Sequence, residues 1–246
     1  MSYRTEILSK GCYRARFADQ SEDLPATLAL RTLCFGTAQT DLDSFDSACS
    51  HVLVEDIRSG ELLCSFRVLE LSDGRQIGRS YSAQYYGLAG LGGFSKPMIE
   101  MGRFCIHPKW SDPDILRLAW GALTRIVDDC GTQMLFGCSS FAGTDVEPYL
   151  DAFAFLKHRY QAPECWQPQP KAPNVVRFGE MLQGKPDVRR AMLDMPPLLR
   201  SYLLMGGWVS DHAVVDAEMN TLHVFTGLEI GAIPIGRQRL LRALAG

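Results

Sequence analysis

The chain has 246 residues, which fits one large domain or two small ones and is enough to bury a sizeable core. Hydrophobic residues make up 46% and charged residues 22%, a composition that excludes a disordered chain. The net charge of -3 gives no global signal for nucleic acid, so we expect no such partner. Because the sequence has no run of eighteen apolar residues and no signal-peptide core at its start, we expect a cytoplasmic protein.

The cysteines and histidines indicate neither disulfides nor a metal site. The eight cysteines include no CxxC pair, and several lie in apolar runs such as ELLCSFRVL and QMLFGCSSF, which favours reduced core thiols. The five histidines show no HExxH or related ligand spacing. We therefore expect no bound metal.

Alternation of apolar and polar residues and β-branched content predict the strands of the first 140 residues. The expected strands cover residues 13–18, 51–57, 62–69, 99–106 and 134–139. The second and third form a hairpin with Arg58, Ser59 and Gly60 at its turn.

Helices are expected between these strands. An early helix covers residues 24–34 and a strong one covers 113–130, where Pro113 suits the first turn and Gly131 can end it. A further helix begins at residue 144 or 145 and extends to 158. A hairpin followed by strand, helix, strand and helix predicts a mixed α/β (α+β) fold.

The last third of the chain begins with the proline-rich segment 161–173, which fits a linker or a crossover. The elements expected after it are a strand in 174–181, a helix over 196–205 and short strands at 207–215 and 222–228. These residues alone would make a weak core. We therefore expect one domain, 1–246, with a core over about 12–160 and a sheet completed by 174–246.

The stretch EMGRFCIHP, residues 100–108, reads as a buried strand with two charges. Side chains alternate along a strand, so Glu100 and Arg103 should point to opposite faces, where each is costly to bury. Arg67 is placed similarly in LLCSFRVLEL. Either Arg67 or Arg103 forms a buried ion pair with Glu100, or the arginines bind a carboxylate in a pocket where Glu100 handles a proton. A bulge at Gly102 would turn Glu100 and Arg103 toward one pocket.

Three other patterns are weaker. The acidic loop TDLDSFDSACSH could hold a substrate ammonium, but acidic loops are usually solvated, which is the expectation for Asp41. GCSSFAG suggests a nucleophile elbow, yet Phe141 stands where GxSxG requires glycine. No spacing requires a pair of Cys138 with His107 or His158.

Several stretches together resemble the ornithine N-acyltransferases that begin bacterial ornithine-lipid synthesis. EMGRFCIHPKW, MLFGCSSFAGTD, FAFLKHRYQAP and MPPLLRSYLLMGGWV look like segments of that family, as do FDSACSHVLVEDIRSGELLCSFRVLEL and YSAQYYGL. The matches follow the family's order from about residue 12 to residue 228. No single motif is diagnostic, but the ordered set is fairly specific.

The resemblance implies a GNAT-like acyltransferase fold, with a mixed central sheet flanked by helices and splayed between strands four and five. The family is similar to the acyl-homoserine-lactone autoinducer synthases, whose recurring charged and aromatic positions match residues of this chain. Those residues are Arg31, Phe35, Asp43, Asp46, Arg67, Glu100 and Arg103. The resemblance thus selects the charges that already stood out inside the strands.

The loop after the strand at 99–106 departs from the acetyl-CoA branch of the fold. That branch holds the CoA pyrophosphate with the backbone amides of a Q/RxxGxG/A signature, whereas the loop here reads HPKWSDPD. The resemblance therefore implies no bound cofactor and an acyl-phosphopantetheine donor on acyl carrier protein. Lys109, Arg117 and Arg125 are candidates to dock the acidic carrier, or they solvate the outer face of the helix.

The implied reaction moves an acyl or 3-hydroxyacyl chain to the α-amine of L-ornithine, giving lyso-ornithine lipid. Glu100 is the candidate base, directly or through a water, and amides of the bulged strand could stabilise the oxyanion. Arg67 and Arg103 would bind the α-carboxylate or order Glu100. Asp43 and Asp46 would hold the side-chain ammonium or shape a lid.

The acyl chain needs an apolar channel, which this fold is expected to place at the splay. Candidate walls and substrate contacts are Phe104, Phe136, Phe141, Phe153, Ser139 and Ser140, although core packing explains the phenylalanines equally well. Because the product would be amphiphilic, peripheral contact with the inner membrane face is plausible, but no basic amphipathic helix requires it.

Three other functions compete with this interpretation. An autoinducer synthase is disfavoured because the loop GTAQTDLDSFD lacks the tryptophan usual there. A CoA-dependent N-acyltransferase is disfavoured by HPKWSDPD. A non-catalytic lipid- or carrier-binding protein of the same fold is the alternative from a different class.

Overall fold

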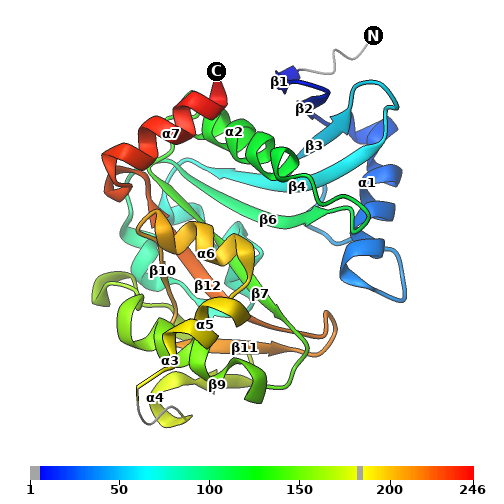
Figure 1. Ribbon diagram of the computed structural model, residues 1–246. Coiled ribbons are helices and arrows are strands. Elements are labelled where there is room, and N and C mark those ends of the chain that lie inside the picture. Colours follow the sequence, from blue (N-terminus) through cyan, green and yellow to red (C-terminus); the bar gives the residue numbers. More distant parts are fainter. Residues whose placement is uncertain (1–5, 182–184) are drawn as a thin grey trace. The chain divides into compact units, whose positions relative to one another are not determined.

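The computed structural model describes residues 6–181 and 185–246 (Figure 1). The chain divides into two compact units. The first comprises Met1–Glu70, Met101–Thr132 and Ile235–Gly246, and the second comprises Leu71–Glu100 and Gln133–Pro234. Strand β6 (Met98–Ile106) contributes residues to both units. The single domain expected from the sequence stays a prediction.

In its described residues, the first unit combines a sheet with three helices. Its strand order is β1-β2-β3-β4-β6. Its elements are β1 (Glu6–Lys10), β2 (Tyr13–Phe17), α1 (Gln20–Phe35), β3 (Ser50–Asp56), β4 (Leu62–Leu71), the second part of β6, α2 (Pro113–Asp129) and α7 (Ile235–Ala245). The α1, α2 and hairpin predictions are confirmed, whereas β1 and α7 were not predicted.

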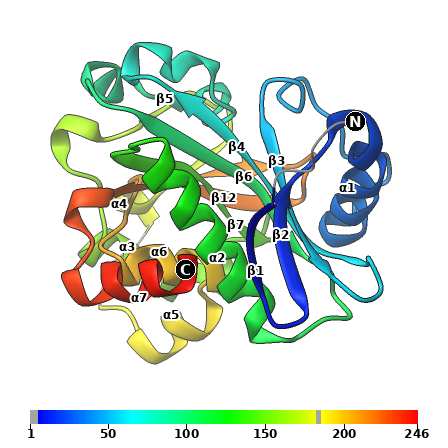
Figure 2. The ribbon, with the colours of Figure 1, turned by 90° about the horizontal axis from the view of Figure 1, so that it is seen from above.

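Local chemistry sets the ends and the packing of these helices. Asp19 accepts a hydrogen bond from the first turn of α1, and Gly36, at φ +65°, ends that helix. Pro113 opens α2. Helix α7 lies beside α2 (Figure 1, Figure 2). Gly121 permits this contact, because a Cβ there would come within 2.7 Å of the Leu244 carbonyl oxygen.

The second unit holds a mixed sheet in the order β6-β7-β12-β11-β9, with β10 beside β12. Its strands are the first part of β6, β7 (Met134–Ala142), β9 (Val175–Arg177), β10 (Trp208–Val209), β11 (His212–Asp216) and β12 (Thr221–Glu229), with β5 (Tyr86–Gly87) and β8 (Gln169–Pro170) as a separate pair. Its helices are α3 (Leu150–Arg159), α4 (Phe178–Met181), α5 (Val188–Asp194) and α6 (Pro197–Leu204). Short 3-10 turns include η1 (Gly74–Arg79), η2 (Ser82–Gln84), η3 (Ala89–Gly93), η4 (Glu147–Tyr149), η5 (Glu164–Trp166) and η6 (Ile230–Ala232).

The parallel pairing of β6 with β7 is short. It covers Met98 to Glu100 against Met134 to Phe136, although both strands continue beyond these residues. This agrees with the splay expected between the fourth and fifth strands of the fold. The register also places Glu100 on the same face of the sheet as Phe136.

The two faces of the second unit's sheet are covered differently. On one face, Phe141 and Phe153 pack in a core with residues of α3, α5 and α6. Alternate residues of β7, β12 and β11 line the other, tyrosine-covered face: Phe136, Cys138, Ser140, Phe225, His223, Val214 and Asp216. The ring of Tyr86 lies on this face, with its centroid 5.6 Å from those of His223 and Phe225.

Some boundaries differ from the prediction for local reasons. The strand expected over 174–181 ends at Arg177, where α4 begins. The strand expected over 207–215 is two strands, β10 and β11, interrupted where the Ser210 hydroxyl bonds the carbonyl of His212. The helix expected from residue 144 or 145 begins at Leu150, after a 3-10 turn that contains Pro148.

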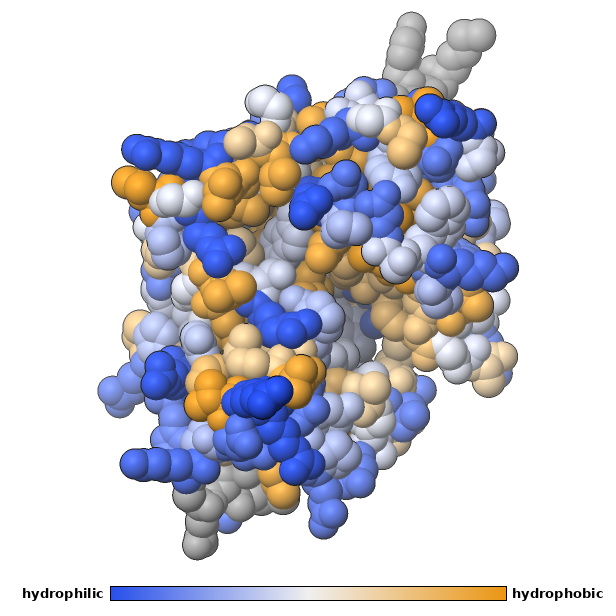
Figure 3. Space-filling view, in the orientation of Figure 1, coloured by the Kyte–Doolittle hydropathy of each residue, from blue (hydrophilic) through white to orange (hydrophobic). Residues whose placement is uncertain are grey.

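Across residues 6–181 and 185–246, no helix is both long enough and apolar enough to cross a membrane. Apolar side chains are nevertheless exposed at the surface, as Figure 3 shows in orange. On α7, Ile235 is 68% and Leu240 is 64% exposed.

Candidate active site

Six charged side chains of the first unit form a closed ring of ion pairs. The cations are Arg31 of α1, Arg67 of β4 and Arg103 of β6, and the anions are Asp41, Asp43 and Asp46 of the loop between α1 and β3. Each aspartate contacts two arginines and each arginine contacts two aspartates. The six formal charges of the ring cancel.

The contacts of the ring are short. Arg31 lies 2.8 Å from Asp41 and 2.6 Å from Asp46. Arg67 donates two hydrogen bonds to Asp43, of 2.6 and 2.7 Å, and one of 2.6 Å to Asp46. Arg103 closes the ring with ion pairs of 3.0 Å to Asp41 and 3.1 Å to Asp43.

Burial and neighbouring charge act in opposite directions on these carboxylates. Burial, the largest effect, raises the pKa of Asp43, but the hydrogen bonds to Arg67 and the charges of Arg67 and Arg103 together outweigh it, and the pKa lies below its usual value. The same balance with Arg31 lowers the pKa of Asp46. Burial also lowers the pKa of His51, whose Nε2 lies 3.2 Å from the Asp46 carbonyl oxygen. Asp43 and Asp46 therefore stay ionised and paired at neutral pH.

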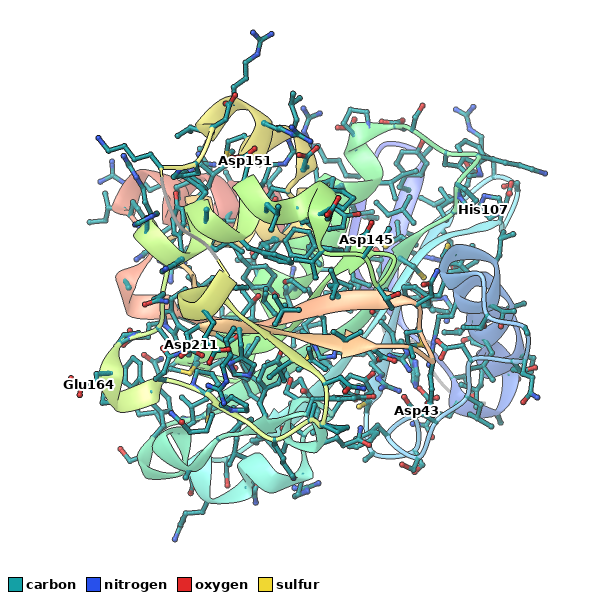
Figure 4. The ribbon with its side chains drawn as sticks, turned by 90° about the horizontal axis from the view of Figure 1, so that it is seen from below. Asp43, His107, Asp145, Asp151, Glu164 and Asp211 are labelled. Atoms are coloured by element: carbon teal, nitrogen blue, oxygen red, sulfur yellow. The ribbon has the colours of Figure 1, made fainter. Side chains whose placement is uncertain are left out.

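The ring corrects the expectation that Asp41 is solvated. Asp41 is buried, because Arg31 and Arg103 both hold its carboxylate. Asp43 is the most exposed carboxylate of the ring, with 22% of its side chain accessible, and Figure 4 labels it. These ion pairs hold the loop against β4 and β6, and the neutral ring has no excess negative charge for a substrate ammonium.

The backbone irregularity expected at Gly102 falls at Arg103 instead. Arg103 has φ +52°, the left-handed region that residues with a Cβ rarely adopt. Gly102 faces the Arg67 side chain, since a Cβ there would lie 3.7 Å from its Nε. The backbone irregularity of β6 therefore falls at the residue that closes the ion-pair ring.

Glu100 of the second unit is a buried carboxylate on which three donors converge. The amides of Tyr81 and Ser82 each donate a hydrogen bond of 2.8 Å, and the Ser82 hydroxyl donates one of 2.6 Å. An ionised carboxylate, which only accepts, satisfies all three. Glu100 thus anchors the start of η2 against β6.

A chain of polar and aromatic groups extends from Glu100 over the tyrosine-covered face. The Ser82 oxygen lies 3.4 Å from Cys138 Sγ. The Tyr81 hydroxyl donates to that of Tyr85 over 3.3 Å, and the Tyr85 ring meets His223 edge-on with centroids 5.0 Å apart. The sequence had offered YSAQYYGL only as part of a resemblance. Its closely spaced tyrosines and serine were the one feature of the sequence that could have indicated these contacts.

The amino terminus of α2 is occupied by the chain's own carboxylate. Asp112 accepts a hydrogen bond of 2.8 Å from the Asp114 amide and another of 2.8 Å from the Tyr13 hydroxyl. The bond from the Asp114 amide, followed by that from Tyr13, lowers the pKa of Asp112. Pro113 has no amide hydrogen to offer. Two negative side chains, Asp112 and Asp114, therefore stand where an anion would bind this helix.

The other predicted site residues occupy different surroundings. Phe35 lies under Arg103, whose guanidinium carbon is 6.0 Å from the ring centroid, and Phe104 stacks on Phe66. Phe141 is buried in the core, and Ser139 accepts a hydrogen bond from Thr226 on the same face.

The remaining candidates are exposed. Ser140 is accessible on the tyrosine-covered face. Lys109, Arg117 and Arg125 are exposed in the first unit, where Arg117 pairs with Asp114 at 2.6 Å.

Comparison with known proteins agrees with this architecture. A model of the acetyltransferase (GNAT) domain matches residues 31–121. The solved structure of FeeM, an N-acyl amino acid synthase from uncultured soil microbes, matches 95% of this chain and 96% of that chain, with a TM-score of 0.51 and 13% identity. The domain match and the structural likeness define the fold class, the GNAT fold.

Sequence similarity places the chain more closely within this class. It is 29% identical over 238 residues to the L-ornithine N(alpha)-acyltransferase of Rhodobacter capsulatus, covering 90% of this chain and 91% of that protein. It is 28% identical over 206 residues to that of Rhizobium meliloti, covering 80% and 69%. The chain is a homologue of the L-ornithine N(alpha)-acyltransferases, and the resemblance predicted from its sequence is confirmed.

Proposed function

We propose that this protein transfers an acyl chain from a thioester to the α-amine of L-ornithine. The observation that carries the proposal is similarity to L-ornithine N(alpha)-acyltransferases across 90% of the chain. The positions of the six charged residues that the resemblance selected also support it. Five belong to the ion-pair ring, and the sixth is Glu100, which binds η2.

The donor we propose is an acyl-phosphopantetheine on acyl carrier protein. A CoA donor would bring its pyrophosphate to the amino terminus of α2, where amides usually bind such groups. Asp112 already caps that terminus and Asp114 adds a second carboxylate, so a pyrophosphate would meet repulsion there. A carrier-bound phosphopantetheine has no pyrophosphate and avoids this conflict.

In the proposed reaction, the neutral amine attacks the thioester carbonyl, the C–S bond breaks and the amide forms. Glu100 accepts the amine proton, directly, through a water or through the Ser82 hydroxyl that already donates to it. Backbone amides of β6 are the proposed donors to the oxyanion. The leaving thiolate needs no strong acid, because the pKa of a thiol is about 8.5.

The carrier and the membrane are proposed to meet exposed surfaces of the first unit. Lys109, Arg117 and Arg125 are accessible to an acidic carrier. Helix α7 presents the exposed apolar side chains of Ile235 and Leu240, which suit brief peripheral contact with the inner membrane face when an amphiphilic product leaves.

Lipid analysis of cells that express the protein tests this proposal. In a host without ornithine lipids, mass spectrometry should detect a new lyso-ornithine lipid, and a Glu100→Gln variant expressed to the same level should form much less. A new acyl-homoserine lactone, or no new acylated amino acid, would contradict the proposal.

A further inference from the structure

One buried histidine on the tyrosine-covered face has an unsatisfied ring nitrogen. His223 is 2% exposed, and its Nε2 has no hydrogen-bond partner among the described residues. Buried polar atoms in folded proteins are almost always paired, so such an atom calls for a ligand or a water. Burial lowers the pKa of His223 to about 4, which leaves the imidazole neutral at physiological pH.

The contacts of His223 fix which nitrogen carries the proton. The Tyr86 hydroxyl lies 2.8 Å from the His223 carbonyl oxygen and 3.1 Å from its Nδ1. A carbonyl can only accept, so the single hydroxyl hydrogen goes to it, and Nδ1–H donates to the Tyr86 oxygen. Nε2 then holds a lone pair, and it diverges from the side of the ring that Tyr86 occupies.

A buried carboxylate lies on the same face as His223. Asp216 is 5% exposed, and the register of β11 with β12 makes it a diagonal neighbour of His223. Its Oδ1 accepts a hydrogen bond of 3.0 Å from the Met219 amide. Two acceptors, one of them negative, together suit a cation with several N–H donors.

An exposed serine and an aromatic ring lie beside His223 on this face. Ser140, which is opposite His223 in the register of β7 with β12, is exposed. The Tyr85 ring lies against His223, and its π face can add to cation binding. The tyrosine-covered face is therefore accessible at Ser140, directly opposite His223 in the sheet.

We infer that Asp216 and His223 form the subsite that binds the side-chain ammonium of the amino-acid substrate. Cys138, beside Ser82, and His223 are diagonal neighbours across β7 and β12, a separation of roughly 7–8 Å. The two amines of ornithine, five bonds apart, are separated by roughly 6 Å. An α-amine near Ser82 thus leaves the side-chain ammonium within reach of the pair. The inference rests on the proposed function, because it names the residues that bind the side-chain ammonium, the group that distinguishes ornithine from a neutral amino acid.

Amino-acid selectivity of the purified protein tests this inference. Norvaline has the carbon skeleton of ornithine without the side-chain amine, so the ratio of kcat/KM for ornithine to that for norvaline reports the subsite alone. Asp216→Asn should lower this ratio on the order of 100-fold with norvaline turnover retained, because a buried ionic contact is lost. His223→Phe, which keeps ring volume but removes the lone pair, should lower it on the order of 10-fold.

Asp145→Asn is the matched control. Asp145, labelled in Figure 4, is also in the second unit and also accepts a turn amide, that of Glu147 at 3.1 Å, but it is exposed. Its substitution should leave the ratio unchanged. An Asp216→Asn protein that keeps the wild-type ratio, or a wild-type protein that acylates both amino acids equally, overturns the subsite while the acyltransferase proposal stands. A wild-type protein that acylates neither overturns both.

Discussion

Removing one buried carboxylate from the ion-pair ring should destabilise the protein far more than removing an exposed one. In Asp46→Asn, Oδ1 no longer offers a negative charge to Arg31 and Arg67, each 2.6 Å away. The three side chains are 2%, 1% and 3% exposed, so water cannot replace the lost charge. Breaking a buried pair in this way costs about 3–5 kcal/mol.

Two further substitutions calibrate this value. Asp43→Asn should cost about 1–2 kcal/mol, because 22% of that side chain is accessible to water. Asp114→Asn removes an equally short pair, 2.6 Å from Arg117, but one that is half exposed, and should cost about 0–1 kcal/mol.

Urea unfolding followed by circular dichroism at pH 7 measures the three losses. The lowered pKa values of Asp43 and Asp46 mean that the contribution of the ring is present above the usual carboxylate pKa of 3.8 and is lost as the pH falls below it. If Asp46→Asn lowers the free energy of unfolding by less than about 1 kcal/mol, or by the same amount as Asp114→Asn, the account of the ring is refuted.

Three other predictions follow from the site. Glu100→Gln should lower kcat by about 10²–10⁴-fold if the carboxylate accepts the amine proton; a variant that folds and turns over normally in an acyl-carrier assay would leave Glu100 only its anchoring role. Lys109→Glu combined with Arg125→Glu should raise KM for acyl carrier protein while KM for a short acyl-pantetheine thioester stays the same, and equal effects on both donors would argue against docking. Since burial lowers the pKa of His223 from 6.5 to about 4, the unfolded chain gains its proton first as the pH falls, and about 3 kcal/mol of stability should be lost between these values. His223→Phe should flatten that part of the stability–pH curve, and an unchanged slope would contradict the burial effect.

Much of the fold could be predicted because local signals and tertiary structure agree. The hairpin turn, the end residues of α2, and alternation along β3, β4 and β7 all lie in short stretches. The strand ends in the segments 174–181 and 207–215 were less predictable, because a short apolar run does not show where its strand stops.

The site was only partly predictable for a related reason. Glu100, Arg67 and Arg103 stood out as charges inside apolar strands, which is a local signal. Asp41 forms ion pairs in the ring only because its loop folds back onto neighbouring elements. The sequence of the loop does not predict this tertiary contact. His223 lay in a short apolar strand and became distinctive only through its contact with Tyr86, 137 residues earlier in the chain.

Product analysis with the purified protein tests the central claim most directly. The protein is incubated with L-ornithine and with equal concentrations of acyl carrier protein thioester or acyl-CoA, and the products are identified by tandem mass spectrometry. The account predicts ornithine acylated on its α-nitrogen, formed faster from the carrier thioester than from the CoA thioester. Acylation of the side-chain nitrogen, faster transfer from acyl-CoA, or no acylated ornithine would contradict it.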